Sequence, residues 1–347
     1  MSWLDDADDE VDEGYDDADF RTRPNPKANR PRTKRRPAHA DAIIARVLGV
    51  DRGRYTVLVD EDGPDEHTTL GVRARELRRQ PIVTGDLARV VGDVSGAEGT
   101  LGRIVGIEPR TTLLRRSADD TDQVERIVVA NADQIVIVVA AADPEPRPRL
   151  VDRYLIAALD AGIHPLLVVT KTDLADPTSF LAHFEGVDDL EVLTSGRDEM
   201  PVDELGAKLV GHATVFVGHS GVGKSTLVNA LVPTAARATG HVNEVTGRGR
   251  HTSSSTVSLR YISERGRGWV IDTPGVRSFG LGHIDPANIL AAFTDLAAVA
   301  EECPRGCTHL PDAPDCAIVE AVAEGRLGER GAARLDSLQR LLSTFAG

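Results

Sequence analysis

The sequence predicts a multidomain protein with an all-β barrel, an α/β domain and a small α-helical domain, in that order. Residues 42–116 contain short apolar runs that alternate at period two between Gly and Asp-Gly turns, as antiparallel strands do. After residue 116, continuous apolar runs alternate with helical segments, which indicates a parallel sheet. Near the end, all the cysteines gather between two predicted helices. We place the domains at residues 41–116, 117–282 and 283–347, after a charged tail at 1–40.

The composition fits several folded domains. A chain of 347 residues is too long for one small core, and 41% of its residues are apolar, which is enough to bury several cores. No apolar run approaches the roughly 20 residues that a membrane span needs, and the start lacks a signal-peptide pattern. We therefore expect a cytoplasmic protein without membrane association. Aromatic residues make up only 4%, so base stacking on an aromatic platform is not expected as the main way of binding nucleic acid.

The first 40 residues are predicted to be disordered because they hold too few apolar side chains to offset chain entropy. Acidic residues come first: Asp5, Asp6, Asp8, Asp9, Glu10, Asp12, Glu13, Asp16, Asp17 and Asp19. Basic residues follow: Arg21, Arg23, Lys27, Arg30, Arg32, Lys34, Arg35 and Arg36. Two interpretations remain open for this tail. It is a solvated segment that aids solubility, or its basic half contacts RNA phosphates while its acidic half competes for them, despite the net charge of −14.

The barrel is predicted from strands at residues 43–48, 55–59, 86–91 and 102–107. About five strands in this length fit an OB-type barrel. A basic cluster between the second and third of these runs contains Arg73, Arg75, Arg78 and Arg79. This cluster either faces RNA or belongs to a solvated loop.

The α/β domain is predicted from a longer series of segments. Strands are expected at 127–129, 134–139, 165–169, 190–193, 213–217, 257–262 and 269–271, and helices at 150–161 and 224–231. Ligands of such sheets bind at the carboxyl ends of the strands, so motifs at those ends carry the function.

A complete G-x-x-x-x-G-K-S sequence connects the strand at 213–217 to the helix at 224–231, which is the context of a phosphate-binding P-loop. Its glycines let backbone N–H groups point at phosphate oxygens, and the helix N-terminus adds positive potential. We expect Lys224 to reach the β- and γ-phosphates and act in catalysis, and Ser225 to bind Mg²⁺. The expected nucleotide-binding residues here are Gly218, His219, Ser220, Gly221, Val222, Gly223, Lys224, Ser225 and Thr226. The alternative is a Gly-rich turn that matches by chance.

Base specificity is predicted from the segment that follows the strand at 165–169. Thr170, Lys171 and Asp173 form a variant of the [N/T]-K-x-D motif, in which the carboxylate accepts hydrogen bonds from guanine and the lysine stem covers the base. Adenine lacks that donor pair, so the motif selects GTP over ATP. Ser195 lies in a small loop after the next strand, where a backbone N–H could reach guanine O6. The alternative for the first motif is that it only caps the following helix.

The remaining motifs of a GTPase follow the P-loop. Asp272 and Gly275 belong to a D-x-x-G sequence, in which the aspartate holds Mg²⁺ through water and the glycine N–H senses the γ-phosphate. Thr252 is expected to be the switch threonine that coordinates Mg²⁺, with Ser253 and Thr256 as competitors. Since the guanine motif precedes the P-loop instead of following it, we predict a circularly permuted GTPase domain.

The C-terminal segment carries Cys303, Cys307, His309 and Cys316, flanked by predicted helices at 286–300 and 316–325. Three thiolates and an imidazole suit a closed tetrahedral Zn²⁺ site. With every position filled by protein, such an ion organises a small domain with little core of its own and does no catalysis. Ordinary buried thiols are the alternative.

In this order, the three domains resemble the RsgA/YjeQ family of small-subunit-dependent GTPases over residues 41–330. The matching sequences are Arg153-Tyr154-Leu155, G-H-S-G-V-G-K-S, G-R-G-R-H-T and D-T-P-G-V-R-S-F-G. The resemblance implies an OB-fold domain that contacts ribosomal RNA, a GTPase stimulated by the 30S subunit, and a role in late 30S maturation. We expect GTP/GDP, Mg²⁺ and one Zn²⁺ per chain as ligands, the 30S subunit and its 16S rRNA as partners, and a monomer.

Two departures from the family pattern concern the sites. Thr170 replaces a more usual Asn, which should weaken a supporting hydrogen bond, and the spacing of the cysteines is shifted by a residue. Val276 stands where Ras-like proteins carry a water-orienting Gln, so we expect slow intrinsic hydrolysis. The resemblance nominates His251 as the catalytic residue that orients water once the ribosome orders its loop.

Two other functions fit part of the sequence. The first is a nucleotide-dependent rRNA-binding assembly scaffold in which hydrolysis is incidental. The second is a permuted GTPase that acts on the large subunit, which the combination of N-terminal barrel and C-terminal Cys/His segment disfavours.

Overall fold

The structure is a computed structural model that describes residues 39–77, 80–117, 125–187, 190–233, 256–273, 279, 281 and 284–344. Nearly all of the charged tail, with Arg78 and Arg79 of the basic cluster, therefore lies outside the described residues. None of the described helices is long and apolar enough to cross a membrane.

The N-terminal strands close into a barrel. They are β1 Ile43–Asp51, β2 Arg54–Val59, β3 His67–Arg73, β4 Leu87–Gly92 and β5 Gly102–Ile107, with the short 3₁₀ helix η1 Arg75–Leu77 after β3. Neighbouring strands pair in the order β1-β2-β3-β5-β4, and β4 pairs back to β1. The β3–β5 pair is parallel and the others are antiparallel. Fully buried Val47, Val57, Val90 and Ile104 fill the interior.

The barrel contains a strand that the sequence pattern did not reveal. In β3, the inward positions are Thr69 and Gly71, so the segment lacks the apolar alternation that marks the other strands. Its place is set by pairing on both edges, with β2 and β5. Arg73 and Arg75 of the basic cluster are exposed.

The predicted strand at 127–129 belongs to a separate hairpin, which corrects the expectation that it joins the parallel sheet. It is part of β7 Glu125–Ala130, which pairs antiparallel with β6 Leu113–Ser117. Asn131, at a positive φ of 58°, follows β7 in a turn, and the parallel sheet begins only after it. Leu114 and Val129 still pack into the α/β core.

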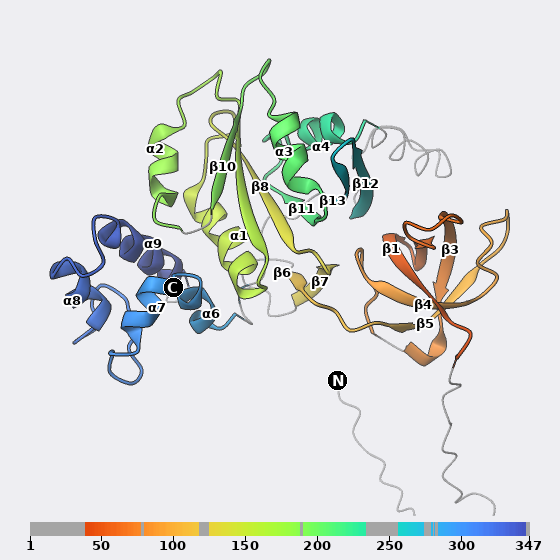
Figure 1. Cartoon of the computed structure of the whole chain (residues 1–347), viewed down its shortest axis with the longest axis horizontal. Helices are drawn as coiled ribbons and strands as arrows, with labels where there is room; N and C mark the ends of the chain where they lie inside the picture. Colours follow the sequence, from red (N-terminus) through yellow and green to blue (C-terminus); the bar gives the residue numbers. More distant parts are fainter. Residues whose placement is uncertain are drawn as a thin grey trace, which may run out of the picture. The chain divides into compact units, whose positions relative to one another are not determined.

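The α/β domain contributes six strands, with helices on both faces (Figure 1), to a sheet that continues into the barrel through a short antiparallel pairing of β12 with β1. Its strands are β8 Gln134–Ala140, β9 His164–Thr170, β10 Glu191–Ser195, β11 Ala213–Val217, β12 Val257–Ser263 and β13 Gly266–Asp272. Its helices are α1 Pro148–Asp160, α2 Thr178–Leu181, η2 Ala182–Phe184, α3 Val202–Leu209 and α4 Lys224–Leu231. One buried cluster joins α1 and α2 to the sheet, and another joins α3 and α4 to the opposite face.

The strand order shows the permutation directly. The sheet runs β10-β9-β8-β11-β13-β12, with β12 antiparallel and the rest parallel. Strands β8 to β10 precede the P-loop in the chain, and β12 and β13 follow it. Because β8 and β13 both pair with β11, the two halves meet on the strand that leads into the P-loop.

The β12–β13 hairpin is fastened to the barrel by a charged cluster around Trp269. The indole Nε1 donates to a Glu61 carboxylate oxygen at 2.8 Å. The guanidinium groups of Arg46 and Arg260 lie 5.4 and 4.6 Å from the ring centroid, within the range of cation–π attraction. Trp269 lies on the strand that ends at Asp272, so the barrel is joined to the element that carries the D-x-x-G motif.

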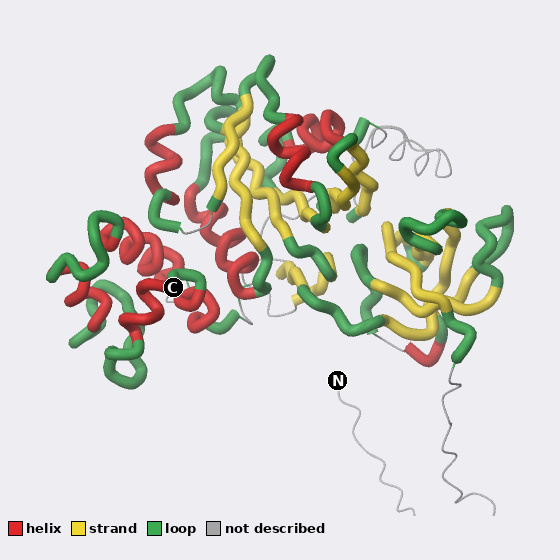
Figure 2. Tube along the Cα trace, in the orientation of Figure 1, coloured by secondary structure: helices red, strands yellow, loops and turns green. Residues whose placement is uncertain are grey.

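The C-terminal segment is helical (Figure 2) and has a larger core than the sequence suggested. Its helices are α6 Pro286–Ala291, α7 Thr294–Ala300, α8 Ala317–Ala323 and α9 Gly331–Ser343. Buried Phe293, Leu338 and Leu341 pack together with Cys316 and with Ile156 of α1. The expectation of little core missed α9, which supplies much of this cluster.

An ion pair also links α9 to α1. Arg340 Nη1 lies 3.3 Å from Oδ1 of Asp152, and the guanidinium sits over the Phe184 ring at 5.0 Å. Burial raises the pKa of Asp152 to about 6, although Arg340 opposes that shift. The two helices are therefore joined by charge as well as by apolar packing.

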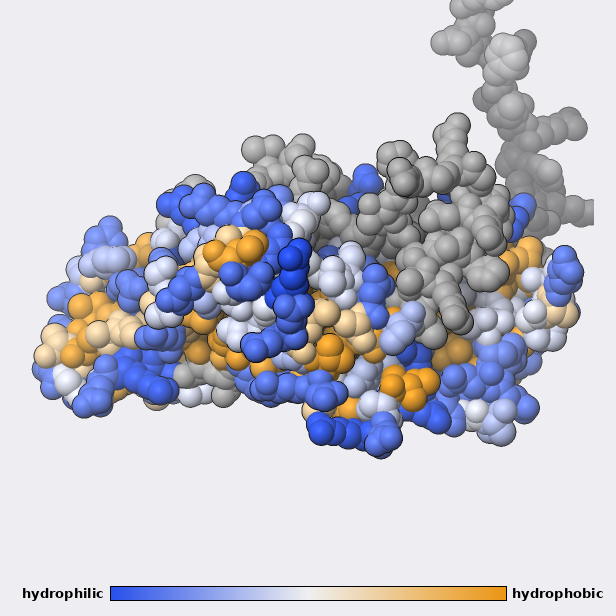
Figure 3. Space-filling model, turned by 90° about the horizontal axis from the view of Figure 1, so that it is seen from above, coloured by the Kyte–Doolittle hydropathy of each residue, from blue (hydrophilic) through white to orange (hydrophobic). Residues whose placement is uncertain are grey.

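Hydrophilic residues dominate the face drawn in Figure 3, where apolar ones form separate patches. Large apolar side chains that remain exposed include Ile44, Leu70, Leu101, Leu174, Val192, Met200 and Ile262. Isolated exposed apolar residues need no special explanation, except where they adjoin a candidate site, as Leu174 does.

Candidate functional site

The P-loop connects β11 to α4 at the carboxyl edge of the sheet, as the sequence predicted. Gly218, Gly221 and Gly223 have φ of 155°, 84° and 92°, which are unfavourable for residues with side chains. A Cβ on Gly218 would also lie 2.4 Å from the Val138 carbonyl oxygen. The loop therefore depends on its glycines, and it turns directly into the N-terminus of α4.

Lys224 and Asp272 meet at this edge. The first residue of α4 and the last of β13 form an ion pair, with side chains only 10% and 20% exposed. Parallel pairing of β11 with β13 sets Asp272 beside Phe216, and the Thr273 hydroxyl donates to the Phe216 carbonyl at 2.7 Å. The P-loop lysine and the D-x-x-G aspartate thus share one site, and Ser225 follows Lys224 on an exposed position.

Thr170 ties the predicted guanine motif to the P-loop. It is the last residue of β9 and 6% exposed. Its hydroxyl lies 2.5 Å from the carbonyl oxygen of Val222 and 3.2 Å from that of Val139. One hydroxyl proton can be donated to only one acceptor at a time, and the shorter contact is the one to the P-loop. Thr170 therefore supports the loop backbone at the residue before Gly223.

We predict that Thr170→Val lowers the affinity for GDP about 5-fold, since a typical hydrogen bond contributes about 1 kcal/mol. Valine keeps the shape but leaves the buried Val222 carbonyl without this donor. Thr172→Val, which removes a neighbouring hydroxyl of the same motif, is the matched control and should bind normally. Calorimetric titration of both variants would refute the role of Thr170 if they bound GDP equally well.

The loops after β9 and β10 are held together around Asp173. The Thr172 N–H donates to the Ser195 carbonyl at 3.3 Å, and the Arg197 N–H donates to Asp173 Oδ1 at 3.0 Å. Lys171, at a positive φ of 57°, donates from Nζ to the Asp143 carbonyl. The carboxylate is thus fixed on one side by a backbone amide. Sequence reasoning missed Asp143 and Arg197 because both act through backbone groups, which leave no residue-type signal.

Most of the predicted switch residues lie outside the part of the chain that the structure describes. They are His251, Thr252, Ser253, Gly275 and Val276. Of the competing hydroxyl residues, Thr256 is described, and its carbonyl accepts a hydrogen bond from the Thr84 hydroxyl at 3.1 Å.

The Cys/His residues converge on one point. The ligand atoms of Cys303, Cys307, His309 and Cys316 all lie within 4.8 Å of one another. His309 Nδ1 is 3.7 Å from the sulfur atoms of both Cys303 and Cys316. A tetrahedral Zn²⁺, with bonds of about 2.3 Å to sulfur and about 2.0 Å to nitrogen, would separate a sulfur ligand from a nitrogen ligand by about 3.5 Å. The cluster therefore has the composition and the dimensions of a closed zinc site.

Contacts outside the ligand atoms connect this cluster to the neighbouring helices. The Gln339 side chain of α9 donates to the His309 carbonyl at 3.1 Å, and Cys316 begins α8 as its N-cap residue. Burial lowers the pKa of His309, which favours the neutral imidazole that binds metals. A bound ion would therefore link the 303–316 loop to both helices.

Sheet order, P-loop and guanine-type motif together define a circularly permuted P-loop GTPase. Comparisons with known proteins agree with this class. A family model described as RsgA GTPase matches residues 107–282. The chain belongs to the RsgA GTPase family, which confirms the resemblance drawn from its motifs.

Curated relatives and solved structures extend this result. The chain is 41% identical over 273 residues to the small ribosomal subunit biogenesis GTPase RsgA of Pseudomonas syringae pv. tomato, covering 76% of this chain and 75% of the relative. It is 38% identical to the small ribosomal subunit biogenesis GTPase RsgA 1 of Vibrio vulnificus, covering 78% of this chain and 76% of the relative. YjeQ from Thermotoga maritima shares the fold at a TM-score of 0.62 and 24% identity, covering 88% and 99%. YloQ, described as a circularly permuted GTPase, matches at a TM-score of 0.60 and 25% identity, with 89% of this chain and 98% of the YloQ chain covered.

Proposed function

We propose that this protein hydrolyses GTP to GDP and phosphate in a cycle of binding to and release from the 30S ribosomal subunit during its late maturation. The observation that carries the proposal is the meeting of Lys224, Asp272 and the Thr170–Asp173 motif at one edge of a permuted sheet. Relatives with this architecture are named small ribosomal subunit biogenesis GTPases.

The residues have separate roles in this proposal. Backbone N–H groups of the P-loop and the Lys224 ammonium hold the β- and γ-phosphates and stabilise the charge that develops on them. Asp173 and the Ser195 loop select guanine, with Lys171 covering the base. Ser225, Asp272 and Thr252 would hold Mg²⁺, which neutralises phosphate charge when bound. The Gly275 N–H would sense the γ-phosphate.

The C-terminal helical segment and the N-terminal barrel have their own roles in this proposal. We assign Zn²⁺ to the Cys303, Cys307, His309 and Cys316 cluster, one ion per chain, because its ligand spacing fits a tetrahedral ion. We assign contact with 16S rRNA to the barrel, where Arg73 and Arg75 are exposed. The same proposal makes the protein a cytoplasmic monomer without membrane association.

Co-sedimentation and turnover test the function. We expect the chain to sediment with 30S rather than 50S subunits in a non-hydrolysable GTP analogue, and to leave them in GDP. Hydrolysis should rise when 30S subunits are added. Binding to 30S subunits without any rise in turnover would favour the alternative of a nucleotide-dependent scaffold, and binding to 50S would reject the assignment.

We further predict that His251→Ala lowers 30S-stimulated hydrolysis at least about 100-fold, the lower end of the usual contribution of a positioned general acid or base. The affinity for GTP should stay unchanged, because the role is in positioning water and not in holding the nucleotide. His183→Ala, at an exposed position of η2, is the control. Undiminished stimulation of His251→Ala would remove this residue from the mechanism.

A further inference from the structure

Arg197 lies beside the carboxylate that is assigned to guanine. It follows β10 by two positions, and its own N–H donates to Asp173 Oδ1 at 3.0 Å. The register of β9 and β10, with Ser195 opposite Thr170, sets the two loops side by side. The Cα of Arg197 is therefore fixed relative to Asp173 by backbone contacts that do not depend on its side chain.

The side chain of Arg197 makes no polar contact within the described part of the chain. Arg197 is exposed, and its guanidinium makes no hydrogen bond or ion pair with any residue that the structure describes. Other arginines of this domain are used by the fold, such as Arg260, which pairs with Asp62 and covers Trp269. Arg197 thus holds a planar cation at the site without an intramolecular partner.

A second observation comes from the other side of the carboxylate. Leu174 directly follows Asp173, and this residue is 59% exposed. Its N–H donates to the Lys171 carbonyl at 3.0 Å, so the turn that presents Asp173 also fixes this leucine. An exposed leucine next to the carboxylate that reads the base is an apolar surface that a purine ring could cover.

We propose that Arg197 and Leu174 complete the base site, with the Arg197 guanidinium stacking on a face of guanine and Leu174 packing against the ring. This inference rests on the proposed GTPase function. The chemistry favours it, because guanidinium groups stack well on aromatic rings. Neither loop contains an aromatic residue, since residues 170–176 are Thr-Lys-Thr-Asp-Leu-Ala-Asp and residues 194–201 are Thr-Ser-Gly-Arg-Asp-Glu-Met-Pro. Besides Lys171, these loops offer the ring the planar cation of Arg197 and the exposed aliphatic side chain of Leu174.

The test is the affinity of the full chain for GDP and for inosine diphosphate, measured by calorimetry. Arg197→Ala should weaken both about 2- to 5-fold, the range of an exposed cation–π contact. The two losses should be equal, because stacking needs the ring and not the exocyclic amine that inosine lacks. Leu174→Ala should also weaken both. Asp173→Asn, in contrast, should weaken GDP far more than inosine diphosphate.

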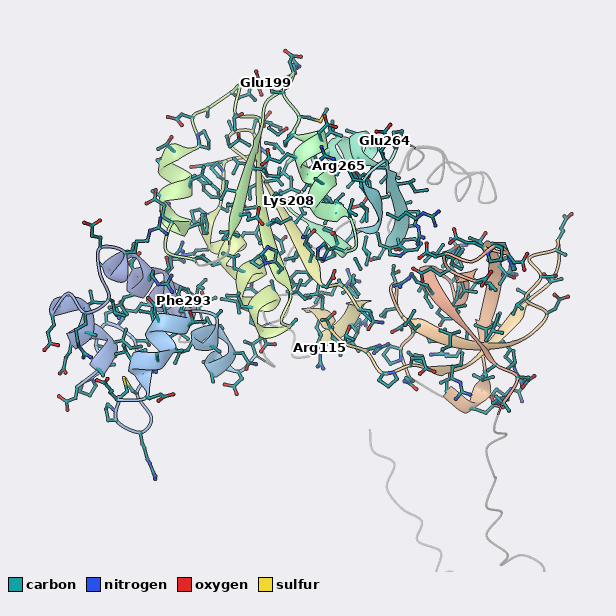
Figure 4. All side chains as sticks on the ribbon, in the orientation of Figure 1. Arg115, Glu199, Lys208, Glu264, Arg265 and Phe293 are labelled. Atoms are coloured by element: carbon teal, nitrogen blue, oxygen red, sulfur yellow. The ribbon has the colours of Figure 1, made fainter. Side chains whose placement is uncertain are left out.

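Further variants separate stacking from charge. Arg197→Lys keeps the charge but loses the planar group, so it should recover little of the affinity. Arg265→Ala removes an exposed arginine from the β12–β13 turn, labelled in Figure 4, and should bind both nucleotides normally. Normal GDP binding by Arg197→Ala, or full recovery by Arg197→Lys, would overturn the proposal. A wild-type chain that bound no guanine nucleotide would instead overturn the proposed function.

Discussion

Replacing Cys316 by serine is expected to abolish stoichiometric zinc binding and to unfold the C-terminal helices. Cys316 is 2% exposed, is the N-cap residue of α8 and packs in the same cluster as Phe293 and Leu338. Structural zinc sites contribute apparent binding free energies of about 10–16 kcal/mol, and a closed site that loses one thiolate loses most of that contribution. Loss of the ion would leave the 303–316 loop joined to α9 mainly by the hydrogen bond from Gln339 to the His309 carbonyl.

Metal content by mass spectrometry and helix content by circular dichroism would check this prediction. Asp312→Asn is the matched control, because Asp312 is an exposed carboxylate in the same loop and no member of the cluster. It should keep the zinc and the helices. The prediction would be contradicted if Cys316→Ser lost zinc but kept its helices and its melting temperature. In that case the apolar core around Phe293 alone would stabilise the domain.

The strongest local signals in the sequence were correct. The strand at 213–217, the P-loop and the helix at 224–231 appear as β11, loop and α4 with the predicted bounds. The Cys/His cluster converges as its spacing implied. These features are predictable because each is set by residue types within one short stretch: buried β-branched runs, glycines that must adopt positive φ, and soft ligands.

The missed features depend on contacts between distant stretches. β3 has Thr69 and Gly71 at its inward positions and is held by its neighbours. β7 has the apolar character of a buried strand, yet it pairs with β6 and forms a hairpin separate from the parallel sheet. In both cases the position of the strand was set by pairing with distant strands. Local residue patterns alone do not encode such pairing.

The same limit applies to the site. Thr170 was predicted to be a weaker substitute for asparagine, but its bond to the Val222 carbonyl joins residues 52 positions apart. The bond from the Arg197 amide to Asp173 spans 24 positions. Such backbone contacts can be formed by any residue type, so only the folded chain reveals which residues support the motif.

Lys224→Ala is expected to lower the affinity for GTP about 100-fold or more, because hydrogen bonds to charged groups contribute about 1.5–3 kcal/mol each and this ammonium serves two phosphates. Lys224 is held at the mouth of the P-loop by α4 and by its ion pair with Asp272. At 9% exposure it is poorly hydrated, so its attraction to phosphate is little screened by water. Hydrolysis should fall at least as far, since the same charge stabilises the transition state.

Removing this lysine also leaves Asp272 without its partner, so stability must be measured with affinity. Lys208→Ala is the matched control: Lys208 of α3, labelled in Figure 4, pairs with Glu191 of β10 at a more exposed position, and such pairs contribute little. Lys224→Gln preserves most of the side-chain length without the charge and should bind as weakly as alanine. If Lys224→Gln kept its fold by circular dichroism and bound GTP within about 10-fold of the wild type, hydrogen bonds to a charged ammonium would not be the main source of phosphate affinity, and backbone N–H groups of the loop would be.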